Sequence, residues 1–328
     1  MKLGLCVLGC GSFAQIFAES LLDARDHVEL YFASRDYRRA QAYSEELGGV
    51  DAFGSYEEAV SDSRVEAAYI CTPHDLHLEN ARLAAAAKKH ILVEKPLART
   101  LQEGRAIIEA ANDAGVTLMV AENYRFLAPV QAAKRIIDSG ALGQVRLIQL
   151  HEEHPFEPGS WRNDRNRNGG GVFIDGGIHK TSVLAYLTGR PTRVYAMPVL
   201  PGTPGLAAED GMVVTTRSAE GVVGIVNHTW SISNPVQRPR VSVTGTLGNL
   251  NFELGRPWLN IEYSDTQETR QFDDDRQGIM AMVLEFRRSI IEKSQPGMTG
   301  EEGLNDLDLV LKAYESAESG LPVDLNGV

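Results

Sequence analysis

Short apolar runs alternate with stretches of helical periodicity over the first 120 residues of the chain. Residues 3–8 and 28–33 are apolar runs of strand length, whereas residues 13–22 and 38–47 repeat their apolar positions at helical spacing. The alternation continues with further strands at residues 67–71, 91–93 and 117–121 and further helices at residues 76–87 and 101–114. This rhythm is typical of βαβ units and predicts an α/β domain with a parallel sheet over residues 1–122.

The pattern changes beyond residue 122. A helix is expected at residues 129–139, a strand at 145–151 and, after an irregular glycine-rich and asparagine-rich stretch, a helix at 177–187. Runs with period-two alternation then follow at residues 194–199, 211–217, 222–230, 240–244, 249–254 and 258–263. Helices at residues 278–293 and 301–318 close the chain. Residues 123–328 are therefore predicted to form an α+β domain on an antiparallel or mixed sheet.

Composition narrows the possible partners. The 328 residues are 43% hydrophobic and 23% charged, which is typical of globular domains. The net charge of -12 repels phosphate backbones and anionic lipids, so we expect no nucleic-acid partner and no membrane partner. No stretch reaches the roughly 20 apolar residues that span a bilayer. Three cysteines without paired spacing, Cys6, Cys10 and Cys71, indicate a reducing compartment, and we expect the cytoplasm.

A glycine-rich loop follows the first predicted strand and opens the first predicted helix. It matches G-x-G-x-x-A, in which Gly9 permits the tight turn, Gly11 lets the backbone approach a pyrophosphate and Ala14 lets helix and strand pack closely. Amides at the start of the helix, at Ser12 and Phe13, provide donors for an anion. These five residues predict a Rossmann domain that binds NAD or NADP.

The residues at the end of the second predicted strand determine whether NAD or NADP is preferred. An acid there binds the ribose hydroxyls of NAD, whereas the 2'-phosphate of NADP needs room and an arginine. Ser34 stands at this position, and Arg35 together with Arg39 can pair with the phosphate. We expect NADP to be preferred; NAD is the alternative if Asp36 turns inward.

Further candidate residues follow the next two strands, where parallel sheets bind their ligands. Residues 71–77 join a strand to a helix, and Glu94, Lys95 and a proline follow the next strand. Farther along, Gly169 begins a triple glycine that leads to Asp175 and His179, which are four residues apart and share one face of a helix. The predicted cofactor groove contains Cys71, Thr72, Pro73, His74, His77, Glu94 and Lys95.

These motifs, in this order, resemble the glucose-fructose oxidoreductase, inositol dehydrogenase and MocA family, and the likeness extends over essentially the whole chain. The resemblance implies a Rossmann domain followed by a domain with a large, mostly antiparallel sheet and one open face. Family members often pair through that face, so a homo-oligomer, a dimer or tetramer, is expected. It also implies that Lys95 lies near the nicotinamide and the reacting oxygen, with Asp175 and His179 on the substrate side.

The chemistry of these residue types suits hydride transfer. A hydride leaves a carbinol carbon as the hydroxyl proton is removed, and a histidine with a pKa near 6.5 can accept that proton. His179 is the predicted base, Asp175 orients substrate or imidazole, and Lys95 stabilises charge on oxygen. The resemblance implies a sugar or polyol-like substrate. Its predicted contacts are Lys95, Asn123, Tyr124, Arg125, Trp161, Arg162, Asp175 and His179.

A metal site and two other functions are alternatives to this interpretation. His151 and His154 stand on opposite faces of a predicted strand, so they cannot converge on one ion and no metal is expected. An enzyme that retains its nicotinamide and uses transient oxidation for elimination or epimerisation is one alternative. A non-catalytic cofactor-binding regulator is another, because function belongs to sites and not to folds.

Overall fold

The computed structural model describes residues 2–155, 159–202, 205–206, 208–234, 240–273 and 277–325. The chain divides into two compact units. The first contains the residues up to Glu122 together with Ile279–Leu304, and the second contains Asn123–Gly278 and the residues from Asn305 onward. The sequence pattern placed every residue after 122 in the second domain, whereas the segment Ile279–Leu304 packs within the first unit.

A parallel sheet of six strands forms the centre of the first unit, in the order β3-β2-β1-β4-β5-β6. Every residue of β1 and β4 is buried, as expected for strands that helices cover on both faces. The strands are β1 Leu3–Leu8, β2 Val28–Ala33, β3 Asp51–Phe53, β4 Ala67–Ile70, β5 His90–Glu94 and β6 Leu118–Ala121. The helices are α1 Ser12–Glu19, α2 Tyr37–Leu47, α3 Tyr56–Ser61, α4 His77–Ala86, α5 Leu101–Ala114 and α9 Ile279–Glu292. The order reverses between β1 and β4, and ligands of such sheets bind at this switch point.

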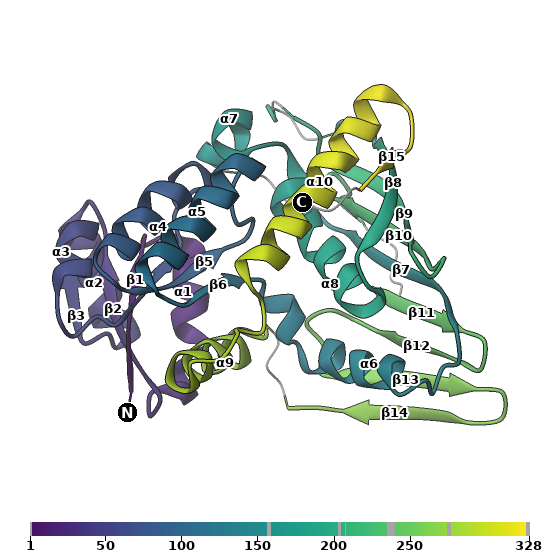
Figure 1. Cartoon of the computed structure of the whole chain (residues 1–328), viewed down its shortest axis with the longest axis horizontal. Coiled ribbons are helices and arrows are strands. Elements are labelled where there is room, and N and C mark those ends of the chain that lie inside the picture. Colours follow the sequence, from purple (N-terminus) through teal and green to yellow (C-terminus); the bar gives the residue numbers. More distant parts are fainter. Residues whose placement is uncertain are drawn as a thin grey trace. The chain divides into compact units, whose positions relative to one another are not determined.

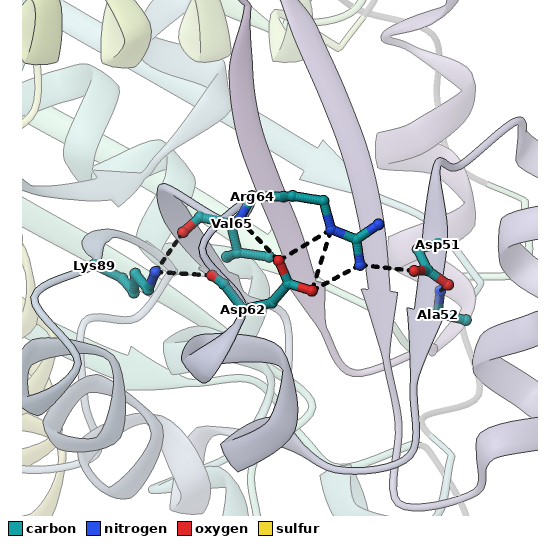
Figure 2. A network of polar contacts seen from close by, with 6 residues as sticks. All are labelled: Asp51, Ala52, Asp62, Arg64, Val65 and Lys89. Carbon is teal, nitrogen blue, oxygen red and sulfur yellow. Dashed lines mark hydrogen bonds and ion pairs between the residues drawn. The ribbon is translucent and has the colours of Figure 1, made fainter.

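An ion-pair network fixes the opposite, amino-terminal edge of this sheet (Figure 2). The Arg64 guanidinium lies 2.7 Å from an Asp62 carboxylate oxygen and 2.8 Å from one of Asp51, the first residue of β3. Lys89 donates to the backbone carbonyls of Asp62 and Val65 at 3.0 and 2.6 Å. The Arg64 hydrogen bonds lower the pKa of Asp62 to about 2. The network joins the starts of β3 and β4, at the end of the sheet away from the glycine loop.

The second unit is built on a nine-stranded sheet in the order β14-β13-β12-β11-β7-β10-β9-β8-β15. Only the β7–β10 pair is parallel among its described strand pairs, so the predicted mostly antiparallel sheet is confirmed. The strands are β7 Val145–Glu153, β8 Pro191–Pro198, β9 Gly211–Ser218, β10 Val223–Thr229, β11 Val241–Gly245, β12 Gly248–Phe252, β13 Trp258–Tyr263, β14 Gln267–Gln271 and β15 Val323–Asp324.

Helices lie along one face of this sheet (Figure 1). α6 contacts β13, and α8 contacts both β7 and β10. On the other face, the side chains of Leu147, Val213 and Ile225 are only half-buried. The helices of the unit are α6 Ala128–Asp138, α7 Arg165–Asn168, α8 Ile178–Thr188 and the larger part of α10 Gly300–Ser319.

Candidate active site

The glycine loop lies between β1 and α1, as predicted. Gly9 has φ +106°, a conformation that side chains rarely adopt, and a Cβ there would lie 2.8 Å from the Cys71 carbonyl oxygen. A Cβ at Gly11 would meet no described atom within 4 Å, so that side of the loop is open. Among the described residues, no side chain caps the start of α1. The loop therefore offers an open helix terminus, which fits the pyrophosphate of a dinucleotide.

The carboxylate of Asp36 is turned toward its own helix. It accepts the Arg38 N–H at 3.1 Å and caps α2, while the Asp36 N–H donates to Ser34 Oγ at 3.2 Å. Burial raises the pKa of Cys10 to about 11, and the charge of Arg39 partly opposes this rise. Ser34 directly follows β2, and the Asp36 carboxylate, which could act as a ribose ligand in its place, caps α2.

His77 joins the loops that follow β4 and β5. Its Nε2 lies 3.1 Å from the Thr72 carbonyl oxygen and its Nδ1 lies 3.0 Å from the Pro96 carbonyl oxygen. The ring is fully buried, and burial lowers the pKa of His77 to about 4. The side-chain amide of Asn80, which also lies on α4, donates to Thr72 Oγ1 at 3.0 Å. His77 thus holds two loops of the predicted groove together, and its contact with the cofactor stays a prediction.

Lys95 and Glu94 occupy contrasting environments at the end of β5. Lys95 is half-buried, whereas the Glu94 carboxylate is buried and accepts a short hydrogen bond from the Tyr69 hydroxyl. Burial raises the pKa of Glu94 to about 7, although the Lys95 charge and the Tyr69 hydrogen bond oppose the rise. Glu94 is therefore a buried acid bonded to Tyr69, and its predicted contact with the cofactor stays a prediction.

The raised pKa of Glu94 makes stability depend on pH. Folded protein binds this proton more readily than unfolded protein, so the stabilisation is fully present below about pH 4.5 and is lost as the pH rises through about 7. At about 1.4 kcal/mol per pKa unit, the loss is at most about 3 kcal/mol. Urea unfolding at several pH values should show a decline in the parent protein that is smaller, by up to about 3 kcal/mol, in Glu94→Gln. The exposed Glu79→Gln on α4 should behave as the parent; an identical decline in Glu94→Gln would contradict the assignment.

Asp175 lies in a π turn, Phe173–Gly177, that leads directly into α8. The sequence placed the helix start at residue 177, but helical backbone begins at Val172. Asp175 is buried and accepts a hydrogen bond of 2.6 Å from Arg162 Nε, while the Arg162 guanidinium lies 4.5 Å from the Trp161 ring centroid. The Asp175 charge is thus compensated and its carboxylate orientation is fixed.

His179 follows one turn later and is half-buried. Its imidazole stacks on the Tyr124 ring with a centroid distance of 4.3 Å and an interplanar angle of 19°. Tyr124 precedes α6, so a residue from another element sets the plane of the ring. The arrangement leaves part of the imidazole accessible while its orientation is held.

A buried charge cluster, which the sequence did not reveal, lies behind these residues. The Glu152 carboxylate forms short ion pairs with Lys180 and with Arg240, and His228 Nδ1 lies 3.3 Å from the same carboxylate. Lys180 is 1% exposed, and its ammonium lies 5.2 Å from the Tyr124 ring centroid. Burial alone would raise the pKa of Glu152, but Lys180 and His228 hold it well below its usual value. The cluster therefore supports the element on which His179 stacks.

Two predicted substrate contacts have packing partners within the second unit. The Arg125 guanidinium lies 4.4 Å from the Tyr186 ring centroid, and the Arg125 carbonyl accepts from Gln131 at 2.7 Å. The Asn123 side-chain amide donates to the Gln277 carbonyl at 2.5 Å. Both residues therefore anchor the segment around Tyr124, and their contact with the substrate stays a prediction.

The described residues offer no cluster of three or more His, Cys, Asp or Glu side chains suited to a metal ion. His151 lies on one face of β7, where its Nδ1 is 3.1 Å from Asn227 Nδ2, and Glu152 lies on the other face with Lys180. In the same described parts of the chain, every helix is too short or too polar to cross a membrane.

Two family models match the chain. Residues 3–122 match the oxidoreductase family with an NAD-binding Rossmann fold, and residues 130–251 match the GFO/IDH/MocA C-terminal domain. A D-xylose 1-dehydrogenase (NADP(+)) from Haloferax volcanii is 30% identical and covers 93% of this chain and 94% of its own. A 1,5-anhydro-D-fructose reductase from Ensifer adhaerens is 28% identical and covers 97% of each chain.

Solved structures show the same fold. The aldose-aldose oxidoreductase from Caulobacter crescentus, complexed with glycerol, superimposes with a TM-score of 0.89 at 26% identity and covers 99% of this chain and 100% of its own. A levoglucosan dehydrogenase in complex with NADH and levoglucosan has a TM-score of 0.90 at 22% identity, with 99% of each chain covered. The chain thus belongs to the glucose-fructose oxidoreductase, inositol dehydrogenase and MocA family and is an NAD(P)-binding oxidoreductase.

Proposed function

We propose that the protein is an NADP-preferring dehydrogenase or reductase that acts on a sugar, an inositol or a related polyol. The observation that carries this proposal is the half-buried imidazole of His179, fixed by stacking on Tyr124 one turn beyond Asp175. The relatives named above add support, because they are named as acting on xylose, anhydrofructose and levoglucosan.

The proposed chemistry divides between three side chains. His179 removes the proton from the carbinol oxygen as the hydride leaves the carbinol carbon, and in the reverse direction it returns the proton to the carbonyl oxygen. Asp175 orients the substrate and does not compete as a base, because its carboxylate is paired with Arg162. Lys95 stabilises the negative charge that develops on the reacting oxygen. The bound nicotinamide supplies the hydride acceptor or donor.

Phosphate recognition supports the cofactor part of the proposal. Backbone amides at Ser12 and Phe13 would hold the pyrophosphate at the start of α1. At the end of β2, Arg35 and Arg39 would pair with a 2'-phosphate, since Asp36 is engaged in capping α2 and presents no carboxylate to repel it. This arrangement favours NADP over NAD.

Exchange of Ser34 for aspartate should reverse the preference. A carboxylate at the end of β2 repels the 2'-phosphate and can accept hydrogen bonds from the ribose hydroxyls of NAD. We expect the ratio of kcat/KM for NADP to that for NAD to fall by up to about 1000-fold, since two unit charges ~4 Å apart interact by about 4 kcal/mol at an effective dielectric of 20 and about 1.4 kcal/mol corresponds to a tenfold change. Ser63→Asp adds the same charge at an exposed position between Asp62 and Arg64 and should leave the ratio unchanged. An unaltered ratio in Ser34→Asp would place the discriminating residue elsewhere.

A direct test follows the absorbance of the reduced nicotinamide. Purified protein would be mixed with NADP or NAD and with a panel of aldoses, inositols and their keto forms, without added metal. Turnover with at least one member, faster with NADP, is the expected result. Absence of turnover across the panel, with cofactor binding confirmed by titration, would overturn the proposed substrate class.

We also propose that the chain forms a homo-oligomer through the side of its nine-stranded sheet that lies opposite α6 and α8. Leu147, Val213 and Ile225 are half-buried there and present apolar side chains on one face. Burial of such a face is favourable on association. Light scattering should give a multiple of the 35.9 kDa chain mass, and Ile225→Lys should shift it toward the monomer. A monomeric parent protein at micromolar concentration would refute the proposal.

A further inference from the structure

The helical segment that carries Asp175 and His179 has an unusual beginning. Its backbone becomes helical at Val172, and the first N–H groups of any helix lack partners within that helix. No local side chain caps this start in the described structure. Four consecutive N–H groups, those of residues 171–174, instead donate to atoms of just two residues, Glu209 and Tyr314.

The bonds form a closed set. Glu209 accepts the N–H of Val172 with its backbone carbonyl at 2.9 Å and the N–H of Phe173 with Oε1 at 2.7 Å. The Tyr314 hydroxyl oxygen accepts the N–H groups of Gly171 and Ile174, each at 3.1 Å. The same hydroxyl donates its proton to Glu209 Oε1 at 2.9 Å. Every donor and acceptor of the hydroxyl is thereby used.

The triple glycine of the sequence makes room for these two side chains. A Cβ at Gly171 would lie 1.7 Å from Glu209 Oε2, and a Cβ at Gly170 would lie 2.6 Å from the Tyr314 hydroxyl oxygen. Neither approach is possible for any residue with a side chain. The glycines are therefore required by Glu209 and Tyr314, which come from the segment before β9 and from α10.

We propose that Glu209 and Tyr314 form a tertiary helix cap that positions Asp175 and His179 for the reaction. Both are positioning residues, because they contact the backbone of the segment and act through the two side chains it carries. The inference deepens the proposed function and rests on it for the identity of those side chains. A backbone shift of about 1 Å at a reacting group can lower the rate about 10²-fold, so loss of the cap at this position should lower kcat.

The charge of Glu209 adds to the cap but is not its only component. A carboxylate at a helix start interacts favourably with the helix dipole. Burial nevertheless raises the pKa of Glu209 to about 7, against the opposing effects of the Phe173 N–H, the Tyr314 hydroxyl and the charge of Arg165. Since both side-chain bonds end on Oε1, glutamine can replace glutamate and keep them. Geometry and charge can therefore be separated by substitution.

The first experiment compares Tyr314→Phe with the parent by amide hydrogen exchange and by steady-state kinetics. Loss of the hydroxyl leaves the N–H groups of Gly171 and Ile174 without their acceptor. We expect residues 171–174 to exchange at least about tenfold faster and kcat to fall about 10- to 100-fold, with the cofactor Kd unchanged. Tyr263→Phe, at an exposed tyrosine of β13, is the matched control and should change neither quantity.

A second pair of variants guards against a general loss of folding. Glu209→Gln should retain kcat within a few-fold and keep the protection of Phe173, whereas Glu209→Ala should lose both. Equal loss in the two variants, or unaltered exchange in Tyr314→Phe, would overturn the cap. The exchange measurement needs no substrate, so it decides the cap even if the panel of sugars shows no turnover. Faster exchange with unchanged kcat would overturn the positioning role.

Discussion

Replacement of His179 by alanine is expected to lower kcat/KM by about 10²- to 10⁴-fold, the usual contribution of a general base. The imidazole is half-buried and stacked on Tyr124, so its removal takes away the proton acceptor without opening the core. The cofactor loop belongs to the other compact unit, and the Kd for NADP should stay within about twofold. Stopped assays at several pH values, with NADP titration by fluorescence, measure both quantities.

Two controls sharpen the His179 prediction. His27→Ala removes an exposed histidine from the first unit and should leave the kinetics intact. Added imidazole should restore part of the lost rate in His179→Ala, because a small base can enter the space left by the side chain. The dependence of kcat/KM on pH should differ between the parent and the variant, because only the parent contains this base. Turnover equal to that of the parent would remove His179 from the mechanism.

Replacement of Lys180 by methionine is expected to destabilise the second unit by about 3 kcal/mol, at the lower end of the range for removing one partner of a buried ion pair. Lys180 is 1% exposed, and its loss leaves the buried Glu152 carboxylate with Arg240 and His228. Burial and the Lys180 charge lower the pKa of His228 to about 4, so it is neutral near pH 7. Arg240 is partly exposed and compensates only in part.

Thermal and urea unfolding would measure this loss. The expected fall in Tm is roughly 6 to 12 °C, at 2–4 °C per kcal/mol for a unit of this size. Lys134→Met breaks an exposed pair with Asp138 and should cost no more than about 1 kcal/mol. The double variant Glu152→Gln with Lys180→Met should be more stable than Lys180→Met alone, since it removes the uncompensated charge. If the double variant were the less stable of the two, the buried carboxylate would not be the source of the loss.

Sequence reasoning succeeded where the determinants are local. The Gly9 loop follows a buried strand and precedes a helix, as predicted. Asp175 and His179 lie on one helical segment, as predicted, although this segment begins earlier and with a π turn. The parallel and antiparallel sheets followed from apolar periodicity. β14 was missed because all five of its residues are exposed, which leaves no alternation to detect.

The remaining features depend on tertiary contacts. His77 stands in a sequence context that fits a groove wall, yet its two nitrogens face carbonyl oxygens from separate loops. The Glu152 cluster joins β7, α8 and β10, and nothing in the local sequence around Lys180 marks it as buried. Asp36 is a partial exception, since an acid two residues before Arg38 at a helix start is a recognisable cap.

The composition of the first unit from two separate stretches of chain bears on how the protein is synthesised. The N–H of Val120, in the last strand of the parallel sheet, donates to the carbonyl of Met298 at 3.1 Å. Nearly all of the second unit is translated between these two residues. The nucleotide-binding unit therefore cannot be completed on the ribosome until most of the second unit has emerged, and a fragment that ends at Glu122 would lack part of its own edge.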